Sequence, residues 1–202
     1  GSGRRYSAGF VAAPGSGAMV TEHDGMQEGL QFEIPPEQFF AVMGVHPSEV
    51  TGMESLADFG PSRFLAERCA DETTWEGRVA CVQRWMRDRI REHEGEPRVL
   101  AAARRLRSVD GNVPVTSLYR DLEMSERSFG RRFQNSLGLG PKKYARLLRF
   151  GAAIQALRSD SPLCDVAAEL GYFDQAHLSR EVKAFSGRTP TQLRQDMLTV
   201  IL

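Results

Sequence analysis

Residues 163–185 read LCDVAAELGYFDQAHLSREVKAF, and this stretch decides the fold. Its first part has apolar residues at the spacing of a short helix, Gly171 then permits a tight turn, and Asp174 can cap a second helix. The apolar positions expected to face inward are Leu163, Val166, Ala167, Leu170, Leu178, Val182 and Phe185. A short helix, a turn and a second helix make up a helix-turn-helix unit.

The same pattern occurs earlier in the chain, 48 residues before in its first part and 49 residues before in its second part. The paired positions are Val115/Leu163, Leu118/Val166, Tyr119/Ala167, Leu122/Leu170, Phe129/Leu178, Arg131/Arg180, Phe133/Val182, Gly138/Gly187, Pro141/Pro190 and Tyr144/Leu193. The slip of one residue indicates two helices in each unit, with a longer turn in the second. In the first unit Ser125 is the expected cap, and Phe129, Phe133 and Leu137 are expected to point inward.

Between the two units, residues 141–159 are predicted to form one long helix that begins at Pro141. A continuous helix is a stiff spacer. It can hold two recognition helices, at about 126–136 and 174–185, at the separation of successive major-groove segments, which is about 34 Å.

The opposite face of each predicted recognition helix carries residue types that read bases. Arg and Gln make bidentate contacts with guanine and adenine edges, and Ala can contact a thymine methyl group. The candidate base-contact residues are Arg127, Gly130, Arg131, Gln175, Ala176, His177 and Arg180. A solvated helix face also favours Arg and Gln, so each helix alone leaves this alternative open, whereas the repeat favours DNA.

Further candidates lie beside predicted helix starts, where backbone N–H groups attract phosphate. The candidate phosphate contacts are Ser125, Lys142, Lys143, Arg188 and Thr189. The alternative is that these are ordinary surface residues.

Charge is divided unevenly along the 202 residues, although 26 Lys and Arg balance 26 Asp and Glu. Residues 1–95 hold nine Arg and no Lys against 15 acidic residues, whereas residues 96–202 hold 17 basic against 11 acidic residues. The halves therefore carry net charges of −6 and +6. A basic half suggests a polyanionic partner, and chance segregation of charge is the alternative.

A helix break at residues 93–97 suggests two domains, 1–95 and 96–202. The N-terminal region is predicted to be a small α+β domain resembling part of a β-barrel, with short strands at 6–12, 18–22 and 30–34. A helix is expected at 37–43, and another from Thr73 or Thr74 through Trp75 to Ile90. The fold class is thus mainly α.

Several segments in the basic half resemble the DNA-binding domain of AraC/XylS-type transcription regulators. They are SERSFGRRF at 125–133, GLGP at 138–141, DVAAELGY at 165–172, LSR at 178–180 and GRTP at 187–190. The resemblance spans residues 97–198 and implies seven helices, two helix-turn-helix units joined by a long helix, and the same base-contact positions. It also implies double-stranded DNA as partner, with a small-molecule effector, a second copy of the chain and RNA polymerase as further candidates.

The sequence departs from that family's pattern at four positions. Tyr119 stands where Ala is usual and Glu123 where Gly is usual, so the first unit is expected to pack differently or to read DNA less strictly. Val182 and Leu193 replace aromatic residues, which preserves an apolar inner face.

For residues 1–95 the resemblance implies a domain that senses a ligand or dimerises. Trp75, Trp85 and Met86 are expected to pack in the core, and the alternatives are that they line an effector pocket or pack between two copies of the chain. His23 and His46 share no helical spacing, so neither a metal site nor any cofactor is expected.

The three cysteines, Cys69, Cys81 and Cys164, form neither a disulfide framework nor a zinc pattern. No membrane span or signal peptide is expected, which predicts a cytoplasmic protein. An enzyme using Cys69 or Cys164 with His23 or His177 is a weak alternative, because the sequence has no nucleophile elbow or phosphate loop.

The leading hypothesis is a sequence-specific transcription regulator that is not an enzyme. The alternative is a module that binds a protein partner through its acidic half and whose DNA binding is vestigial.

Overall fold

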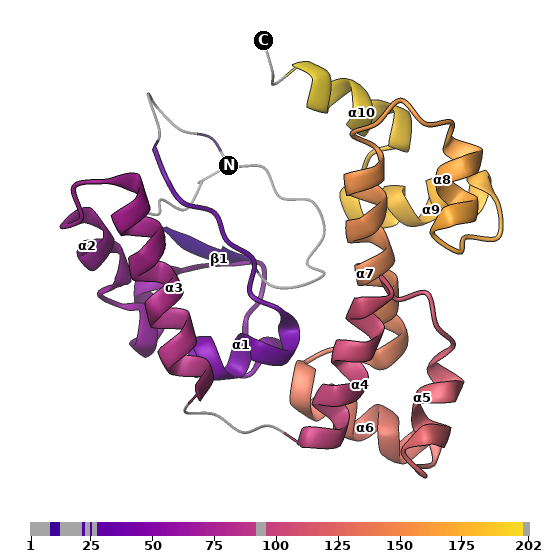
Figure 1. The fold of residues 1–202 in the computed structure, drawn as a ribbon, viewed down its shortest axis with the longest axis horizontal. Coiled ribbons are helices and arrows are strands. Elements are labelled where there is room, and N and C mark those ends of the chain that lie inside the picture. The colour runs from indigo at the N-terminus through magenta and orange to yellow at the C-terminus, as the bar shows by residue number, and fades with distance from the viewer. Residues whose placement is uncertain (1–8, 13–21, 23–24, 26–27, 92–95, 200–202) are drawn as a thin grey trace. The chain divides into compact units, whose positions relative to one another are not determined.

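The computed structural model describes residues 9–12, 22, 25, 28–91 and 96–199, which divide into two compact units with the main boundary after Pro97 (Figure 1). The described residues are mainly helical, as the sequence predicted for the chain, and the N-terminal unit also holds a small sheet. In the part of the chain that the structure describes, no helix combines the length and the apolar character that crossing a membrane requires.

The sheet of the N-terminal unit has two strands of three residues each. Strand β1 (Phe10–Ala12) pairs antiparallel with β2 (Met53–Ser55), so that Val11 lies opposite Glu54. The prediction of a strand at 30–34 is wrong, because these residues are in neither helix nor strand. Most of the predicted strand at 18–22 lies outside the described residues. Two short strands do not make the barrel fragment that the sequence suggested.

Helices and short helical turns supply the core of the N-terminal unit. Its α-helices are α1 (Pro36–Met43), α2 (Leu65–Ala70) and α3 (Trp75–Arg91), and its short 3₁₀ turns are Pro47–Glu49, Leu56–Asp58 and Gly60–Ser62. Val42, Met43 and Trp85 are buried in one apolar cluster. The indole Nε1 of Trp85 donates a hydrogen bond to the Pro61 carbonyl at 3.0 Å, so Trp85 is a core residue. Thr74 caps α3, because its hydroxyl accepts the Gly77 N–H at 3.0 Å.

Residues 96–199 form seven helices, which is the number that the resemblance implied. These are α4 (Pro97–Ser108), α5 (Val115–Asp121), α6 (Glu126–Leu137), α7 (Pro141–Ala156), α8 (Leu163–Glu169), α9 (Gln175–Ser186) and α10 (Pro190–Thr199). Helix α7 ends three residues earlier than predicted. Four residues separate α5 from α6 and five separate α8 from α9, which confirms the longer turn of the second unit.

Helix α7 runs past both helix-turn-helix units (Figure 1) and contributes side chains to an apolar core in each. In the first, the rings of Phe129 and Phe133 are 5.4 Å apart, and Phe133 lies 5.6 Å from Tyr144 of α7. In the second, Leu178 and Val182 of α9 pack with Ala153 of α7. The predicted inner faces of both recognition helices are therefore confirmed.

Two of the four departures from the family pattern have visible structural consequences. Glu123 has a φ of +54°, the left-handed region that favours glycine, and Gly171 at the equivalent position of the second unit has +70°. Tyr119 packs its ring 6.4 Å from that of Phe129. Val182 is fully buried and Leu193 packs against the second core, so the apolar inner face is kept.

Candidate nucleic-acid interface

Helix α6 begins at a serine cap and turns its apolar face inward. The Ser125 hydroxyl accepts the Ser128 N–H at 3.2 Å, which satisfies one of the free donors of the first turn. Phe129, Phe133 and Leu137 are completely buried. Their burial leaves the opposite face outward, where Arg127 and Arg131 are exposed. Among the described residues, neither arginine has a hydrogen-bond or ion-pair partner.

Gly130 lies between these two arginines in the middle of α6 and is half-buried. A Cβ atom added there would have nothing within 4 Å. Packing within the protein therefore does not require a glycine, although glycine destabilises a helix interior by about 1 kcal/mol relative to alanine.

Helix α9 is capped by Asp174, whose carboxylate accepts the His177 N–H at 2.6 Å. Leu178 and Val182 are completely buried. Gln175, Ala176 and Arg180 are exposed, and the Arg180 Nε donates to the Ala176 carbonyl at 3.3 Å. The guanidinium end of Arg180 remains available for an external acceptor.

His177 differs from the other candidate base contacts because the turn holds its ring. The ring is half-buried, lies edge-on to Tyr172 at 5.4 Å, and its Nδ1 accepts the Phe173 N–H at 3.4 Å. These contacts orient the start of α9 and leave Nε2 as the ring's remaining polar atom.

A hollow of about 330 Å³ lies at the start of α6 and α7 and brings together candidates of both kinds. Its lining residues are Val115, Glu126, Arg127, Phe129, Gly130, Gly140, Pro141, Lys142 and Lys143. The Lys142 Nζ lies 3.3 Å from the Glu126 carboxylate, and the two side chains are 77% and 65% exposed. An ion pair so exposed contributes about 0–1 kcal/mol, so a phosphate can readily replace Glu126 as partner. Lys143 is exposed and has no polar partner among the described residues.

The two remaining phosphate candidates lie before α10 and have intramolecular partners. Arg188 pairs with Asp196 at 2.8 Å, again on the surface. Thr189 and Gln192 form a reciprocal cap: the Gln192 Oε1 accepts the Thr189 N–H at 2.9 Å, and the Thr189 hydroxyl accepts the Gln192 N–H at 3.3 Å. The Thr189 hydroxyl also donates to Gln192 Oε1 at 3.1 Å, so its donors serve the cap.

The cysteines and histidines do not form a catalytic or metal site in the described residues. Burial raises the pKa of the Cys69 thiol to about 11, and a side-chain hydrogen bond with Cys81 acts in the same direction. Cys69 is thus a poor nucleophile at neutral pH. No group of three or more His, Cys, Asp or Glu side chains within the described ranges could hold a metal ion. His23 lies outside these ranges.

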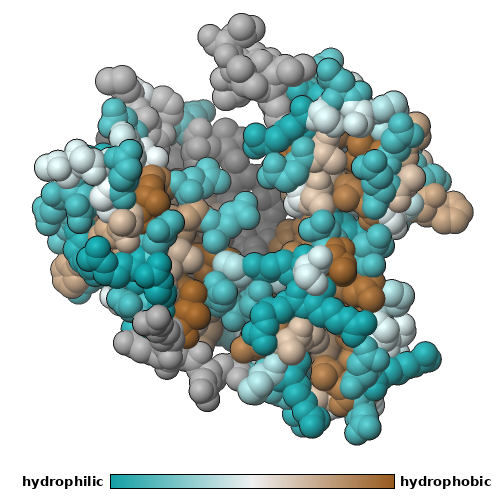
Figure 2. All heavy atoms as spheres, viewed as in Figure 1, coloured by the Kyte–Doolittle hydropathy of each residue, from teal (hydrophilic) through white to brown (hydrophobic). Residues whose placement is uncertain are grey.

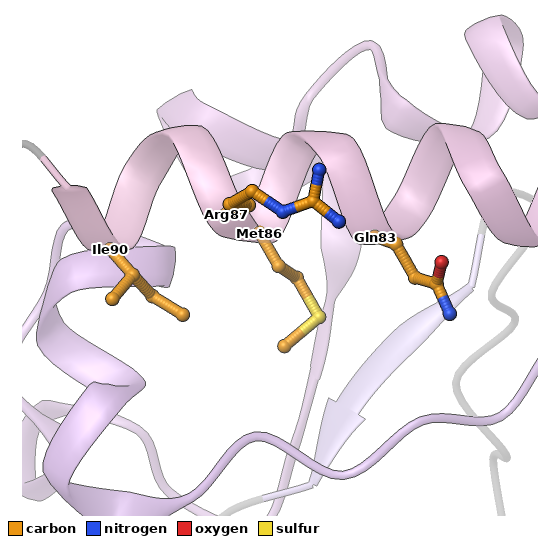
Figure 3. A pocket seen from close by; sticks show the side chains of 4 residues that line it. All are labelled: Gln83, Met86, Arg87 and Ile90. Atoms are coloured by element: carbon orange, nitrogen blue, oxygen red, sulfur yellow. The ribbon is translucent and has the colours of Figure 1, made fainter.

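A second hollow, of about 340 Å³, lies along α3 in the N-terminal unit and is lined by Gln83, Met86, Arg87 and Ile90 (Figure 3). Met86, Ile90 and Gln83 extend to one side of the helix. Met86 lines this hollow and also packs against the core, and Trp85 is part of the core, as expected for both from the sequence. Trp75 and Val79 are 43% and 39% exposed on the same helix.

Sequence reasoning missed three residues of the C-terminal unit whose exposure or contacts are unusual. Phe173 is 92% exposed directly before the cap of α9. Arg146 and Arg149 of α7 reach other elements: Arg146 makes a bidentate pair with Glu181 of α9, and Arg149 donates to the Gly111 carbonyl. From the sequence alone, a basic residue on a helix that contacts another element cannot be told from one that faces solvent.

Teal hydrophilic and brown apolar side chains are mixed on the face drawn in Figure 2.

A comparison with protein families supports the helix-turn-helix assignment of the C-terminal half. Residues 118–196 match a family described as a helix-turn-helix domain. Among solved structures, the C-terminal domain of AraT, a response regulator from Geobacillus stearothermophilus, is similar at 21% sequence identity and a TM-score of 0.48. That match covers 52% of this chain and 88% of the other. No curated protein sequence matches the chain.

The matched segment begins within α5 and contains α6, α7 and the whole of the second helix-turn-helix unit. The family match and the fold therefore agree that this segment is a helix-turn-helix domain, a type of domain that transcription regulators use to bind DNA.

Proposed function

We propose that α6 and α9 enter two successive major-groove segments of a DNA duplex and that the protein thereby recognises a specific sequence. The observation that carries this proposal is the pair of outward faces, with Arg127 and Arg131 on α6 and Gln175 and Arg180 on α9. Arginine bonds guanine through O6 and N7, and glutamine bonds adenine through N6 and N7. The two helices thus offer different residue types to the two segments.

The phosphate contacts proposed beside these faces are Ser125, Lys142, Lys143, Arg188 and Thr189, and they differ in availability. Lys143 has no polar partner among the residues that the structure describes, while Lys142 and Arg188 would exchange an exposed carboxylate for a phosphate. Ser125 still has a hydroxyl proton to donate. For Thr189, the cap of α10 is the main role that its contacts support.

The test starts with selection of bound sequences from random duplex DNA by the full chain. Against the selected site, Arg131→Ala and Arg180→Ala should each weaken binding by about 1–3 kcal/mol with little change in thermal stability. Arg104→Ala is the matched control, since Arg104 is equally exposed but lies on α4. Unchanged affinity in both recognition-helix variants would refute the proposal, and failure to select any sequence would favour vestigial DNA binding.

For the N-terminal unit we propose a regulatory role, through an effector or a second copy of the chain. The supporting observation is an apolar stripe along one side of α3, formed by Trp75, Val79, Met86 and Ile90, of which the first two are exposed. Val79→Glu should lower the molecular mass measured by sedimentation equilibrium if the stripe joins two copies. A monomeric wild-type chain would leave the effector role as the proposal.

A further inference from the structure

The turn of the second helix-turn-helix meets the turn between α4 and α5, beside α7. In the turn between α4 and α5, Gly111 has a φ of +73° and lies so close to α7 that an added Cβ would be 2.2 Å from the Ala145 carbonyl oxygen. That oxygen belongs to the backbone of a helix and cannot move aside. The turn between α4 and α5 is therefore seated directly on α7.

The turn of the second helix-turn-helix, between α8 and α9, lies against the turn between α4 and α5. An added Cβ at Gly171, which has a φ of +70°, would lie 2.1 Å from the Asn112 Oδ1. Gly171 lies in the turn that leads into recognition helix α9, whereas Asn112 follows Gly111 in the turn between α4 and α5. The close approach of these two residues joins segments that are distant in sequence.

One side chain of α7 contacts both turns. The Arg149 NH1 group donates to the Gly111 carbonyl at 2.9 Å, and its guanidinium carbon lies 6.0 Å from the centroid of the Tyr172 ring, near the limit of a cation–π contact. Arg149 is half-buried, and its Nε is buried without a hydrogen-bond partner in the described residues. A charged group is costly to remove from water, so its position between the turns is held by these contacts.

A second arginine, one helical turn earlier, anchors the recognition helix itself. Arg146 forms a bidentate pair with Glu181 of α9, with N···O distances of 2.9 and 2.7 Å, and its guanidinium lies 5.4 Å from the Phe185 ring. The Glu181 side chain is only 12% exposed. Helix α9 is thus fixed to α7, and the turn before α9 lies against the turn between α4 and α5.

We propose that Arg149 is a positioning residue that locks α6 and α9 into one relative orientation, so that the protein tolerates only one spacing between its two DNA segments. This inference rests on the proposed function. Inserting one base pair moves the second segment by about 3.4 Å and rotates it by about 35° around the duplex. Helix α6 packs on α7 through Phe133 and Tyr144, and the turn before α9 is held at α7 through Arg149, so the two recognition helices cannot follow such a change.

The DNA experiment uses the full chain, its selected site, and derivatives with one base pair inserted or removed between the two segments. Wild type should lose about tenfold to a hundredfold in affinity on one insertion, the cost of displacing an arginine–guanine pair. Arg149→Ala should bind the original site more weakly and lose less on insertion. Arg149→Lys should not restore the wild-type ratio of affinities for the original and the inserted site, because an ammonium group cannot reproduce the planar guanidinium with its several N–H donors. Arg158→Ala, an exposed residue just after α7, is the control and should match wild type. An unchanged spacing ratio in Arg149→Ala would overturn the proposal.

A second measurement without DNA separates this inference from the proposed function. Spin labels at Arg127→Cys on α6 and Lys183→Cys on α9, in a Cys164→Ser background, report the distance between the recognition helices by pulsed electron resonance. The wild-type distance distribution should be narrow, and Arg149→Ala should broaden it while the far-ultraviolet circular dichroism stays unchanged. Tyr172→Phe keeps the ring and should keep the narrow distribution. Equal widths with and without Arg149 would overturn the inference, whereas a narrow wild-type distribution in a protein that selects no DNA sequence would refute only the proposed function.

Discussion

Replacing Gly130 by alanine is expected to make the protein more stable and to weaken its binding to DNA. The two effects have separate causes. In the folded protein a Cβ at this position meets nothing within 4 Å, so the methyl group has room. Alanine is better than glycine in a helix interior by about 1 kcal/mol, which corresponds to a rise of about 4–8 °C in melting temperature for a unit of roughly 100 residues.

The expected loss of affinity follows from the position of Gly130 between Arg127 and Arg131 on the outward face of α6. If the α6 backbone approaches a base or a phosphate at this point, a methyl group must displace it. Inserting a methyl group into a closely packed contact costs about 1–3 kcal/mol, so affinity for the selected site should fall by about fivefold to 150-fold.

Gly151→Ala supplies a matched control. Gly151 also lies within a helix, α7, and its added Cβ also meets nothing within 4 Å. Thermal unfolding followed by circular dichroism should show a similar rise in both variants, and fluorescence anisotropy with labelled duplex should show weaker binding only for Gly130→Ala. Wild-type affinity in the more stable Gly130→Ala protein would refute the reasoning that DNA approaches α6 here.

Three further outcomes are expected. Glu123→Gly should raise the melting temperature, because a left-handed φ of +54° costs a residue with a Cβ about 1–2 kcal/mol, and thermal unfolding measures this directly. Exposed Cys164 should react with a thiol reagent at pH 7 well before Cys69, whose raised pKa of about 11 keeps it protonated, as mass mapping of the labelled peptides would show. Burial raises the pKa of Tyr172 from 10 to about 12. The contribution of the neutral tyrosine to the free energy of unfolding is therefore fully present below pH 10 and is lost as the pH rises through 12. Unfolding curves measured across this range should show a smaller loss of stability for Tyr172→Phe.

Local sequence patterns predicted most of the C-terminal fold, because the same helix-turn-helix pattern occurs twice in the chain and each copy supports the interpretation of the other. Phe129, Phe133, Leu178 and Val182 are buried as their helical spacing indicated. The N-terminal strands were less predictable. The partner of β1 is Met53–Ser55, about 40 residues along the chain, and nothing local in either three-residue segment specifies that pairing.

The candidate site shows the same division between local and distant information. Spacing predicted that Arg127 and Arg131 point outward, since this follows from the helix period alone. The contacts of Arg149 with Gly111 and Tyr172 depend on how three separate segments meet, and an arginine on a helix looks the same in sequence whether it faces solvent or a junction. Glu123 lies between these cases, because the resemblance marked it as a position where glycine is usual, while its positive φ is visible only in the structure.

The zero net charge of the chain does not set the salt dependence of DNA binding, because that dependence counts the phosphates neutralised at the interface. Of the proposed phosphate contacts, Lys143 has no polar partner in the described residues, whereas Lys142 and Arg188 pair with Glu126 and Asp196. These surface pairs are themselves screened by salt, so the two cations exchange a weak partner for a phosphate at little cost. The acidic residues 1–95 can oppose the approach of DNA at long range, but they leave the number of contacts at the recognition helices unchanged. The balance of charge therefore bears on how fast DNA is encountered, and the local cations bear on how tightly it is held.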